Sequence, residues 1–543
     1  MTGAEAQRRS WAALAWVPSA QTVWPVFITV GVLALFLVAK LALILLVESI
    51  APLQGYLIVF GVSTLAAFAG RNAHINHSSE IFARLSGATA LGLAFYLLVE
   101  PTVYLAAQPD TRLVSAMLRV GDFAAFAAAV AGIRRPTFLI MPAVHVITAR
   151  LLVDDVSGLP MGKHDILYLA EAGIFIALGS VVSRSLARAR LELEPDVHRN
   201  LTHCFAFVAI GFHLANYFWS GIGKVILDGR PFEWLLANDV SNFLVVGIEK
   251  GIAPLGSVPA LAQTVHDALS SGSLFFNGFV LTIQLLAIVS IARLMWLRVG
   301  AICYDLLHVG VYVFGGVLFW PWIWMNGAVL WAIRGENDRS VGISPKICCA
   351  ICILVCGLPV LGAASWLAWY DVADTRISNV EAQTATSANW TPVPLSFFGA
   401  HSYSVSHGYL DRGHRAGHFD PSVPGLAYNS ARRRADGSCA VPQVEDRPES
   451  EQAQVERLMY FDSFMRARHQ AAKQEAKWFG KYAYYLRLHH HPSNPMLYSN
   501  FHALALDDIV RYRLVTRSVC LALKDGHVTR RILKEDAHVV EIY

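Results

Sequence analysis

Long apolar runs separated by short polar segments occupy the first two thirds of this 543-residue chain. A run of about 20 apolar residues is long enough for a helix to cross the hydrocarbon core of a bilayer. The pattern therefore predicts a mainly α, polytopic transmembrane bundle of about nine to eleven spans. The short run 320–333 fits a re-entrant or interfacial segment. The expected spans lie near 24–47, 53–70, 86–107, 117–133, 136–153, 165–187, 201–223, 273–292, 297–320 and 345–370.

Composition supports a membrane protein. Apolar residues make up 55% of the chain and charged residues only 15%, whereas soluble domains are about a quarter charged. The net charge of +4 says little about partners, because basic loops orient membrane proteins in any case. The sequence has no strong basic stripe with interleaved aromatic residues, so nucleic acid is not an expected partner. The lipid bilayer is an expected partner.

The basic loops predict an orientation. Basic clusters fall near 71–84, 134–135, 183–190, 293–298 and 334–346, and the positive-inside rule places them in the cytoplasm. The segment 1–23, with Arg8 and Arg9, is expected to be cytoplasmic and to precede an uncleaved first span. The bundle then covers 24–371. The loop 225–272 and the tail 372–543 are expected on the periplasmic or lumenal side.

The tail reads as a smaller α+β domain. The segment "ISNVEAQTATSANWTPVPLSFF" is typical of strand and turn. The charged segment that follows position 445 predicts a helix, with Val455, Leu458, Phe461 and Met465 at helical spacing. Asp525-Gly526 lies between two strand-like runs and predicts a hairpin.

Two sets among the eight cysteines are informative. Cys348, Cys352 and Cys356 share one helical face, which favours packing over metal binding. Cys439 and Cys520 are the two cysteines of the tail, and an external tail would allow them to form a disulfide. The histidine-rich stretches of the tail are interpreted as solvated loops, so no metal is expected.

Three apolar stretches carry ionisable groups that simple packing does not require. Such groups are costly within a membrane and mark functional sites by default. The alternatives are polar side chains that join helices and, for Lys224, a side chain that extends to the membrane interface. Asp305 and His308, at i and i+3, are expected to form a hydrogen-bonded pair or to line a pocket. The groups are His164, Asp165, Tyr168 and Glu171; His213, Asn216, Tyr217 and Lys224; and Asp305, His308 and Tyr312.

Three segments resemble one membrane family. "NYFWSGIGKVILDGRPFEW" is similar to the lysine segment of the vitamin K-dependent γ-glutamyl carboxylases, part of the HTTM group. "KHDILYL" resembles the histidine-tyrosine-leucine segment of that family, and "YDLLHVGVYVFGGVLFWPWIWMN" resembles its later aspartate-leucine-histidine span. The three segments occur in the family's order, and the resemblance covers roughly 160–400. The tail is much shorter than in the animal carboxylases.

The resemblance implies quinol chemistry. In that family the membrane bundle oxidises a reduced quinone with O2, and the strong base that results removes a γ-proton from glutamate before CO2 adds. Lys224 matches the lysine that deprotonates the quinol, and His164 would orient or polarise the intermediate. The implied cofactor is a reduced, vitamin K-like quinone. The implied quinone-binding residues are Tyr217, Phe218, Trp219, Tyr168, Asp305 and His308.

Two functional hypotheses follow. In the first, the chain is an integral membrane enzyme that carries out carboxylation or related chemistry on a lipid-soluble or peptide substrate. In the second, it is a non-catalytic scaffold of a membrane complex that docks membrane or periplasmic proteins through its tail. An enzyme needs a cavity that joins Lys224 and His164 to the lipid or to water, whereas a scaffold fills that space with side chains.

Overall fold

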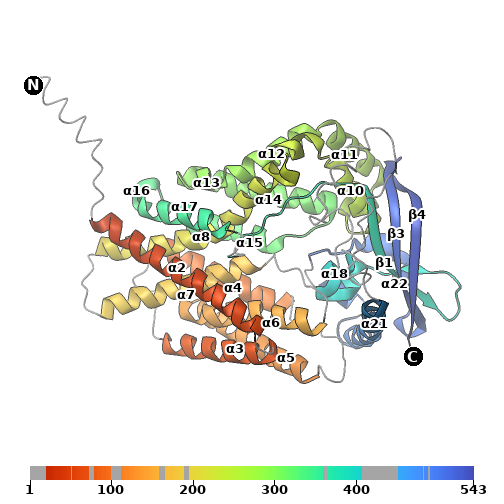
Figure 1. The fold of residues 1–543 in the computed structure, drawn as a ribbon, viewed down its shortest axis with the longest axis horizontal. Coiled ribbons are helices and arrows are strands. Elements are labelled where there is room, and N and C mark those ends of the chain that lie inside the picture. The colour runs from red at the N-terminus through yellow and green to blue at the C-terminus, as the bar shows by residue number, and fades with distance from the viewer. Residues whose placement is uncertain are drawn as a thin grey trace, which may run out of the picture.

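The chain forms a mainly helical body with a small antiparallel sheet near its C-terminus. Figure 1 shows the first helices gathered at one end and the sheet at the other. The computed structural model describes residues 20–49, 52–71, 79–99, 112–157, 166–188, 195–358, 361, 364–406, 439, 451–480, 482–486 and 490–542.

The first seven described helices follow the predicted apolar runs, with ends that differ by a few residues. The largest difference is at the third run, where the helix begins at Glu80 and ends at Val99. The helices are α2 (Ala20–Ser49), α3 (Pro52–Ala69), α4 (Glu80–Val99), α5 (Arg112–Gly132), α6 (Ile140–Ser157, after the 3-10 turn Pro136–Leu139), α7 (Leu167–Arg188) and α8 (Pro195–Val225).

Helix α8 is the centre of the bundle. It has 31 residues, and its side chains from Leu201 to Tyr217 are buried. It packs against α7, α2 and α17 (Ser344–Cys356). Gly211 provides room for the contact with α17, since a Cβ there would lie 2.9 Å from the Cβ of Cys352. Polar side chains on α8 are therefore held inside the protein.

The segment after α8 is more structured than a connecting loop. The region expected as an external loop, 225–272, contains three helices, and the expected span 273–292 is divided at Leu286. The elements are the 3-10 turn Leu227–Gly229, α9 (Glu233–Ala237), α10 (Ser241–Glu249), the 3-10 turn Pro254–Ser257, α11 (Pro259–Ser271), α12 (Ser273–Leu285), α13 (Ala287–Ser290), α14 (Leu294–Gly315), α15 (Trp320–Ala332), α16 (Asp338–Val341) and α17.

Six described helices are long and apolar enough to cross a membrane. A seventh is possible if α11 and α12, which meet at 75°, count as one bent span. This is fewer than the nine to eleven expected, because several apolar runs fold into helices shorter than 18 residues. The six candidate spans are Val23–Ala42, Glu80–Val99, Leu113–Gly132, Leu167–Leu186, Pro195–Val225 and Leu294–Gly315.

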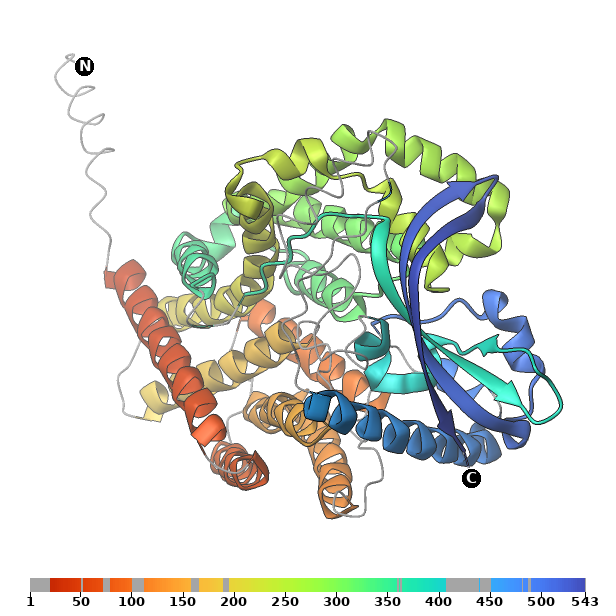
Figure 2. The ribbon, with the colours of Figure 1, turned by 45° about the vertical axis from the view of Figure 1, so that its right-hand side comes forward.

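The expected last span, 345–370, is wrong. Helix α17 ends at Cys356, and residues 365–372 form neither helix nor strand. The sequence gives the reason, since Gly357 and Pro359 follow the helix and both oppose its continuation. We name residues 364–373 the strap. The chain passes along it from α17 to the sheet, as Figures 1 and 2 show.

The tail confirms the predicted strands, helix and hairpin. The sheet has the order β2-β1-β3-β4, with every pairing antiparallel. Asp525 (φ 53°) and Gly526 (φ 75°) form the two-residue hairpin turn between β3 and β4. The strands are β1 (Asp374–Thr384), β2 (Thr391–Pro392), β3 (Ile509–Lys524) and β4 (His527–Glu541).

Helix α21 (Glu451–Phe479) packs beside the sheet, as Figure 2 shows. Phe461 and Met465 are buried in the tail's core, but Val455 is half exposed, so the helix buries only part of its predicted face. The smaller elements are the 3-10 turn Leu395–His401, α18 (Ser402–Ser406), the 3-10 turns Ala483–Leu486 and Pro495–Tyr498, α22 (Ser499–Ala503) and the 3-10 turn Leu506–Asp508.

The tail is joined to the bundle by specific contacts. At the hairpin, Gly526 N donates to Gln263 Oε1 at 2.9 Å, and Arg530 pairs with Glu249 at 2.6 Å. Within the tail, Cys439 and Cys520 form a disulfide with a Cα–Cα distance of 5.9 Å.

The cysteines of α17 pack against α8. Cys348, Cys352 and Cys356 are all buried, and Cys352 Sγ donates to the carbonyl of Val208 at 3.5 Å. Among the described residues, no group of three or more His, Cys, Asp or Glu side chains is arranged to hold a metal ion.

Candidate functional site

Helix α8 carries two sets of buried polar side chains, and each set contacts a different part of the chain. His213 and Tyr217 lie one turn apart and face α14 and α15. Asn216, Ser220 and Lys224 lie at i, i+4 and i+8 and face the strap. Side chains at this spacing share one side of a helix, so one helix supports both groups.

The first group is a hydrogen-bonded network centred on Asn326. The amide oxygen of Asn326 accepts from His213 Nε2 at 2.8 Å. Its amide nitrogen donates to the Tyr217 hydroxyl at 3.0 Å and to Asp305 Oδ1 at 2.8 Å. The Tyr217 hydroxyl also meets His308 Nε2 at 2.8 Å. We name Tyr168, His213, Tyr217, Asp305, His308, Trp322 and Asn326 the aromatic–histidine cluster.

The indole of Trp322 is the aromatic centre of this cluster. Tyr217 also stacks on Tyr304, with ring centroids 3.8 Å apart. The network is therefore enclosed by rings that come from α7, α8, α14 and α15. The distance from the ring centroid of Trp322 to that of each surrounding ring is 4.9 Å for Tyr217, 5.2 Å for Tyr168, 5.3 Å for His308, 5.8 Å for His213 and 5.9 Å for Phe319.

Three buried ring nitrogens of the cluster have no hydrogen-bond partner in the described part of the chain. They are His213 Nδ1, His308 Nδ1 and Trp322 Nε1. Because His213 uses Nε2–H to reach an amide oxygen, its Nδ1 is an acceptor, whereas the indole N–H can only donate. A buried polar group without a partner costs about 1–3 kcal/mol. Such groups are rare in folded proteins, so three of them in one cluster need an explanation, and a bound polar ligand is one.

The cluster lies one layer below an apolar surface. Helix α14 supplies Asp305 and His308 from its inner side, and Asp305 is partly exposed. On its outer side Ile302, Leu306 and Val309 are 51%, 62% and 48% exposed. Large apolar side chains at such exposure fit contact with lipid.

The second group binds the strap. Ser365 N donates to Asn216 Oδ1 at 2.8 Å, and the Ser365 carbonyl accepts from Ser220 Oγ at 3.1 Å. Leu367 N donates to Ser220 Oγ at 3.1 Å, and the Leu367 carbonyl accepts from Lys224 Nζ at 2.6 Å. The extended backbone of the strap therefore obtains hydrogen bonds from side chains in place of strand partners.

The same pattern continues beyond α8. The Trp369 carbonyl accepts from Trp234 Nε1 at 2.7 Å. Asp371 N donates to Asn238 Oδ1 at 2.7 Å, and its carbonyl accepts from Asn242 Nδ2 at 3.0 Å. Alternate strap residues at 365, 367, 369 and 371 are thus fixed by α8, α9, its C-cap Asn238, and α10.

Lys224 is enclosed by this arrangement. The residue is 7% exposed, and its ammonium lies 5.4 Å from the ring centre of Trp234 and 5.8 Å from that of Trp369. The amine is directed into the protein, whereas a side chain that extends to the membrane interface would be exposed. Asp371 lies nearby, and burial raises the pKa of its carboxyl to about 6, while hydrogen bonds from Asn238 and Trp369 oppose that rise.

The predicted quinone-binding residues separate in the structure. Tyr168, Tyr217, Asp305 and His308 come together in the cluster. Trp219 instead stacks on Trp366 with centroids 4.8 Å apart and donates to the Ile353 carbonyl, and Phe218 packs edge-on against Trp219. The three consecutive aromatic residues of α8 point in different directions around the helix, so they form no single wall.

The expected Asp305–His308 pair is also wrong. Asp305 accepts from Asn326, and His308 meets Tyr217. Glu171, which the sequence groups with Tyr168, forms an ion pair with Lys40 of α2 at 2.5 Å. His164 lies outside the described residues.

The sequence placed His213 among the ionisable groups without a role, and it left two cluster members, Trp322 and Asn326, out of the candidate site. A signal was present for both of these, because Trp322 and Asn326 lie at i and i+4 in α15 and present one face to α8. Comparisons of the chain with protein-family models, curated proteins and solved structures found no match.

Proposed function

We propose that this chain is a multi-pass membrane enzyme that binds a reduced quinone or a similar lipid-soluble ring compound at the aromatic–histidine cluster and takes a proton from its hydroxyl group. The observation that supports the proposal most is the set of three buried ring nitrogens around Trp322. The six candidate spans support the membrane location.

The donor and acceptor set of the cluster fits such a ring. A hydroxyl group can donate to His213 Nδ1 and accept from Trp322 Nε1, and the surrounding aromatic rings can contact the faces or edges of a planar molecule. When bound, a reduced quinone supplies the electrons that the resemblance assigns to O2-coupled carboxylation.

The side chains of the cluster have complementary roles in this proposal. His213 is the group that accepts the proton, and Asn326 fixes its tautomer through the bond to Nε2. Asp305 holds Asn326 in that orientation. Lys224, the base implied by the resemblance, is in contact with the strap, so a role in proton transfer requires that the strap move away from α8.

Binding to the purified protein tests the proposal. The wild type in lipid nanodiscs should bind a short-chain reduced quinone and consume O2 in its presence. His213→Gln and Asn326→Leu should lose both signals, and Trp219→Phe, which changes an aromatic side chain of α8 outside the cluster, should retain them. If the wild type and His213→Gln bind the quinol equally well, the cluster is not the site.

Two observations favour the scaffold as the second candidate. The space around Lys224 is filled by the strap and two indoles. In addition, β4 is a 15-residue edge strand whose outward side chains are mostly exposed. An exposed edge strand can pair with another chain. Cross-linking in intact membranes tests that alternative by comparing the wild type with an Ile532→Pro variant of this edge strand. If the chain is a scaffold, the variant should lose its cross-linked partner while quinol binding is unaffected.

We further propose that the tail lies on the periplasmic or lumenal side. The Cys439–Cys520 disulfide supports this side, because disulfides persist in oxidising compartments. A reporter enzyme that works only after export should be active when it is fused after Tyr543. Activity restricted to the cytoplasm would overturn the orientation.

A further inference from the structure

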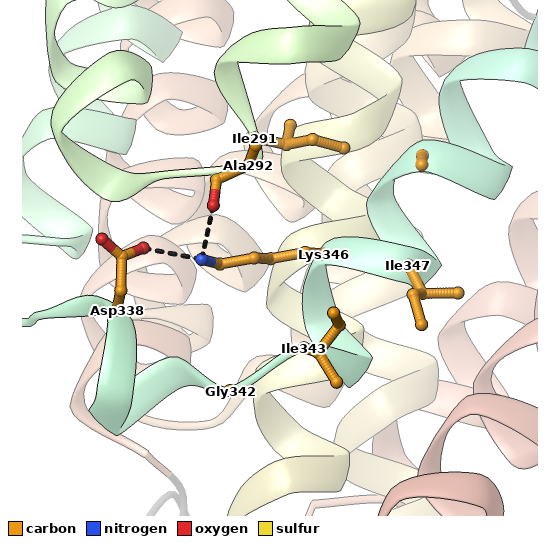
Figure 3. A pocket seen from close by; sticks show the side chains of 8 residues that line it. Ile291, Ala292, Asp338, Gly342, Ile343, Lys346 and Ile347 are labelled. Carbon is orange, nitrogen blue, oxygen red and sulfur yellow. Dashed lines mark hydrogen bonds and ion pairs between the residues drawn. The ribbon is translucent and has the colours of Figure 1, made fainter. Parts of the chain in front are cut away.

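A pocket opens at the end of the bundle where the candidate span α14 begins. It has a volume of about 560 Å³ and is formed by the residues before α14 together with α16 and α17. Figure 3 shows Ile291, Ile343 and Ile347 around it, with the Lys346 side chain extending across. Ala350 completes the apolar lining. The pocket therefore combines apolar walls with one cation.

Lys346 has two partners that leave its ammonium at the pocket. Its Nζ donates to the Ala292 carbonyl at 2.7 Å and to Asp338 Oδ1 at 2.6 Å. Asp338 also accepts from Leu294 N at 3.1 Å and is 45% exposed in its side chain. An exposed ion pair contributes little to stability, so a stronger anion can replace the carboxylate at Lys346.

The surroundings of the pocket match the boundary of a bilayer. Exposed Trp296, in the first turn of α14, has the guanidinium of Arg293 5.3 Å from its ring centre, and tryptophan prefers the membrane interface. Ile343, on the pocket's lip, is 52% exposed. Arg293, Arg339 and Lys346 provide three positive charges in this region, against the two carboxylates of Glu336 and Asp338. The rim is therefore positively charged overall.

We propose that this pocket binds an anionic phospholipid, with the phosphate group at Lys346 and an acyl chain against the isoleucine side chains. Basic pockets between membrane helices favour anionic headgroups, and lysine acts as a point charge toward phosphate. The inference rests on the membrane location proposed above and does not depend on the aromatic–histidine cluster.

Lipid binding by the delipidated full-length protein in detergent provides the test. The probes are dioleoyl phosphatidylglycerol, dioleoyl phosphatidylcholine and inorganic phosphate, each measured by native mass spectrometry. The wild type should bind phosphatidylglycerol more tightly than phosphatidylcholine. Lys346→Gln should weaken phosphatidylglycerol binding about fivefold, the effect of one basic residue near anionic lipid. Arg334→Gln removes the same charge from an exposed position outside the pocket and should bind like the wild type.

A second variant tests the acyl-chain contact. Ile343 is the N-cap residue of α17, where asparagine is favoured, so Ile343→Asn should fold. It should weaken phosphatidylglycerol binding without affecting the phosphate signal. Equal binding of the two lipids by the wild type, or unchanged phosphatidylglycerol binding in Lys346→Gln and Ile343→Asn, would overturn the proposal. Binding of phosphate that equals that of phosphatidylglycerol would show a simple anion site and would also overturn it. Quinol binding by the same samples reports separately on the proposed function.

Discussion

Replacing Lys224 by methionine tests whether this lysine holds the strap on α8. Methionine keeps much of the apolar stem but removes the ammonium that donates to the Leu367 carbonyl at 2.6 Å. The carbonyl belongs to a segment without helix or strand partners, so it has no regular ladder to rejoin. Leaving a buried acceptor without a donor costs about 1–3 kcal/mol. The contacts with the Trp234 and Trp369 rings are lost as well.

The natural comparison is Ser220→Ala, one turn earlier on α8. Ser220 Oγ accepts from Leu367 N and donates to the Ser365 carbonyl, both at 3.1 Å. This variant should lose roughly 1–2 kcal/mol, because neutral hydrogen bonds are weaker than those of a charged donor. If the strap detaches as a unit, the double variant loses less than the sum of the two single losses, by about 0.5 kcal/mol or more.

The assay is denaturant unfolding in detergent, followed by tryptophan fluorescence, since Trp366 and Trp369 lie in the strap. Lys224→Arg should also be less stable than the wild type, because the longer guanidinium has to fit between two indoles and a carbonyl. If Lys224→Met unfolds at the wild-type denaturant concentration, Lys224 does not hold the strap, and a catalytic role becomes its better explanation.

Three further perturbations probe other parts of the molecule. Changing Cys439 and Cys520 to serine should lower the free energy of unfolding by roughly 2–4 kcal/mol; reduced wild type should match the variant, and unreduced peptides with two free thiols would refute the pairing. Tyr56→Phe should cost about 1–3 kcal/mol, because the buried His145 Nδ1 loses its 3.0 Å partner; an unchanged midpoint in the same denaturant titration would contradict this. Burial lowers the pKa of Lys250 from its ordinary 10.5 to about 7. Between pH 7 and 10.5 the amine is therefore protonated in the unfolded chain but neutral in the folded protein. Stability should therefore rise as pH increases above about 7, and a slope equally steep in Lys250→Met would refute that source.

The hydrophobic pattern predicted the tail and most helices for identifiable reasons. The Asp525-Gly526 turn requires positive φ at both positions, which few other residue pairs tolerate. The apolar runs 165–187 and 201–223 are long and continuous, and they became α7 and α8 with only small changes at their ends. Local preference and long-range packing agree at these places, so local reasoning was sufficient.

The pattern failed where long-range contacts override hydropathy. Residues 345–370 are mostly apolar, yet their last seven residues belong to the strap, because side chains of α8 to α10 provide the hydrogen bonds that a helix would otherwise make internally. No local property of the sequence indicates that these hydrogen-bond partners will be present. The cluster has the same origin, since His213, Asp305 and Asn326 are more than 20 residues from one another and meet only after α14 and α15 pack against α8.

The strap gives the two ends of the molecule a direct physical connection. Asp371, fixed by Asn238 and Asn242, is three residues before β1 begins at Asp374, and Lys224 is bound four residues earlier at Leu367. Side chains of α8 provide hydrogen bonds to the main chain of the strap, so a strap that left α8 would leave these polar groups unpaired. Along the chain, the hydrogen bonds with Asn238 and Asn242 lie between the sheet and the contact of Leu367 with Lys224. The strap is therefore the covalent connection between the Lys224 contact and the first strand of the sheet.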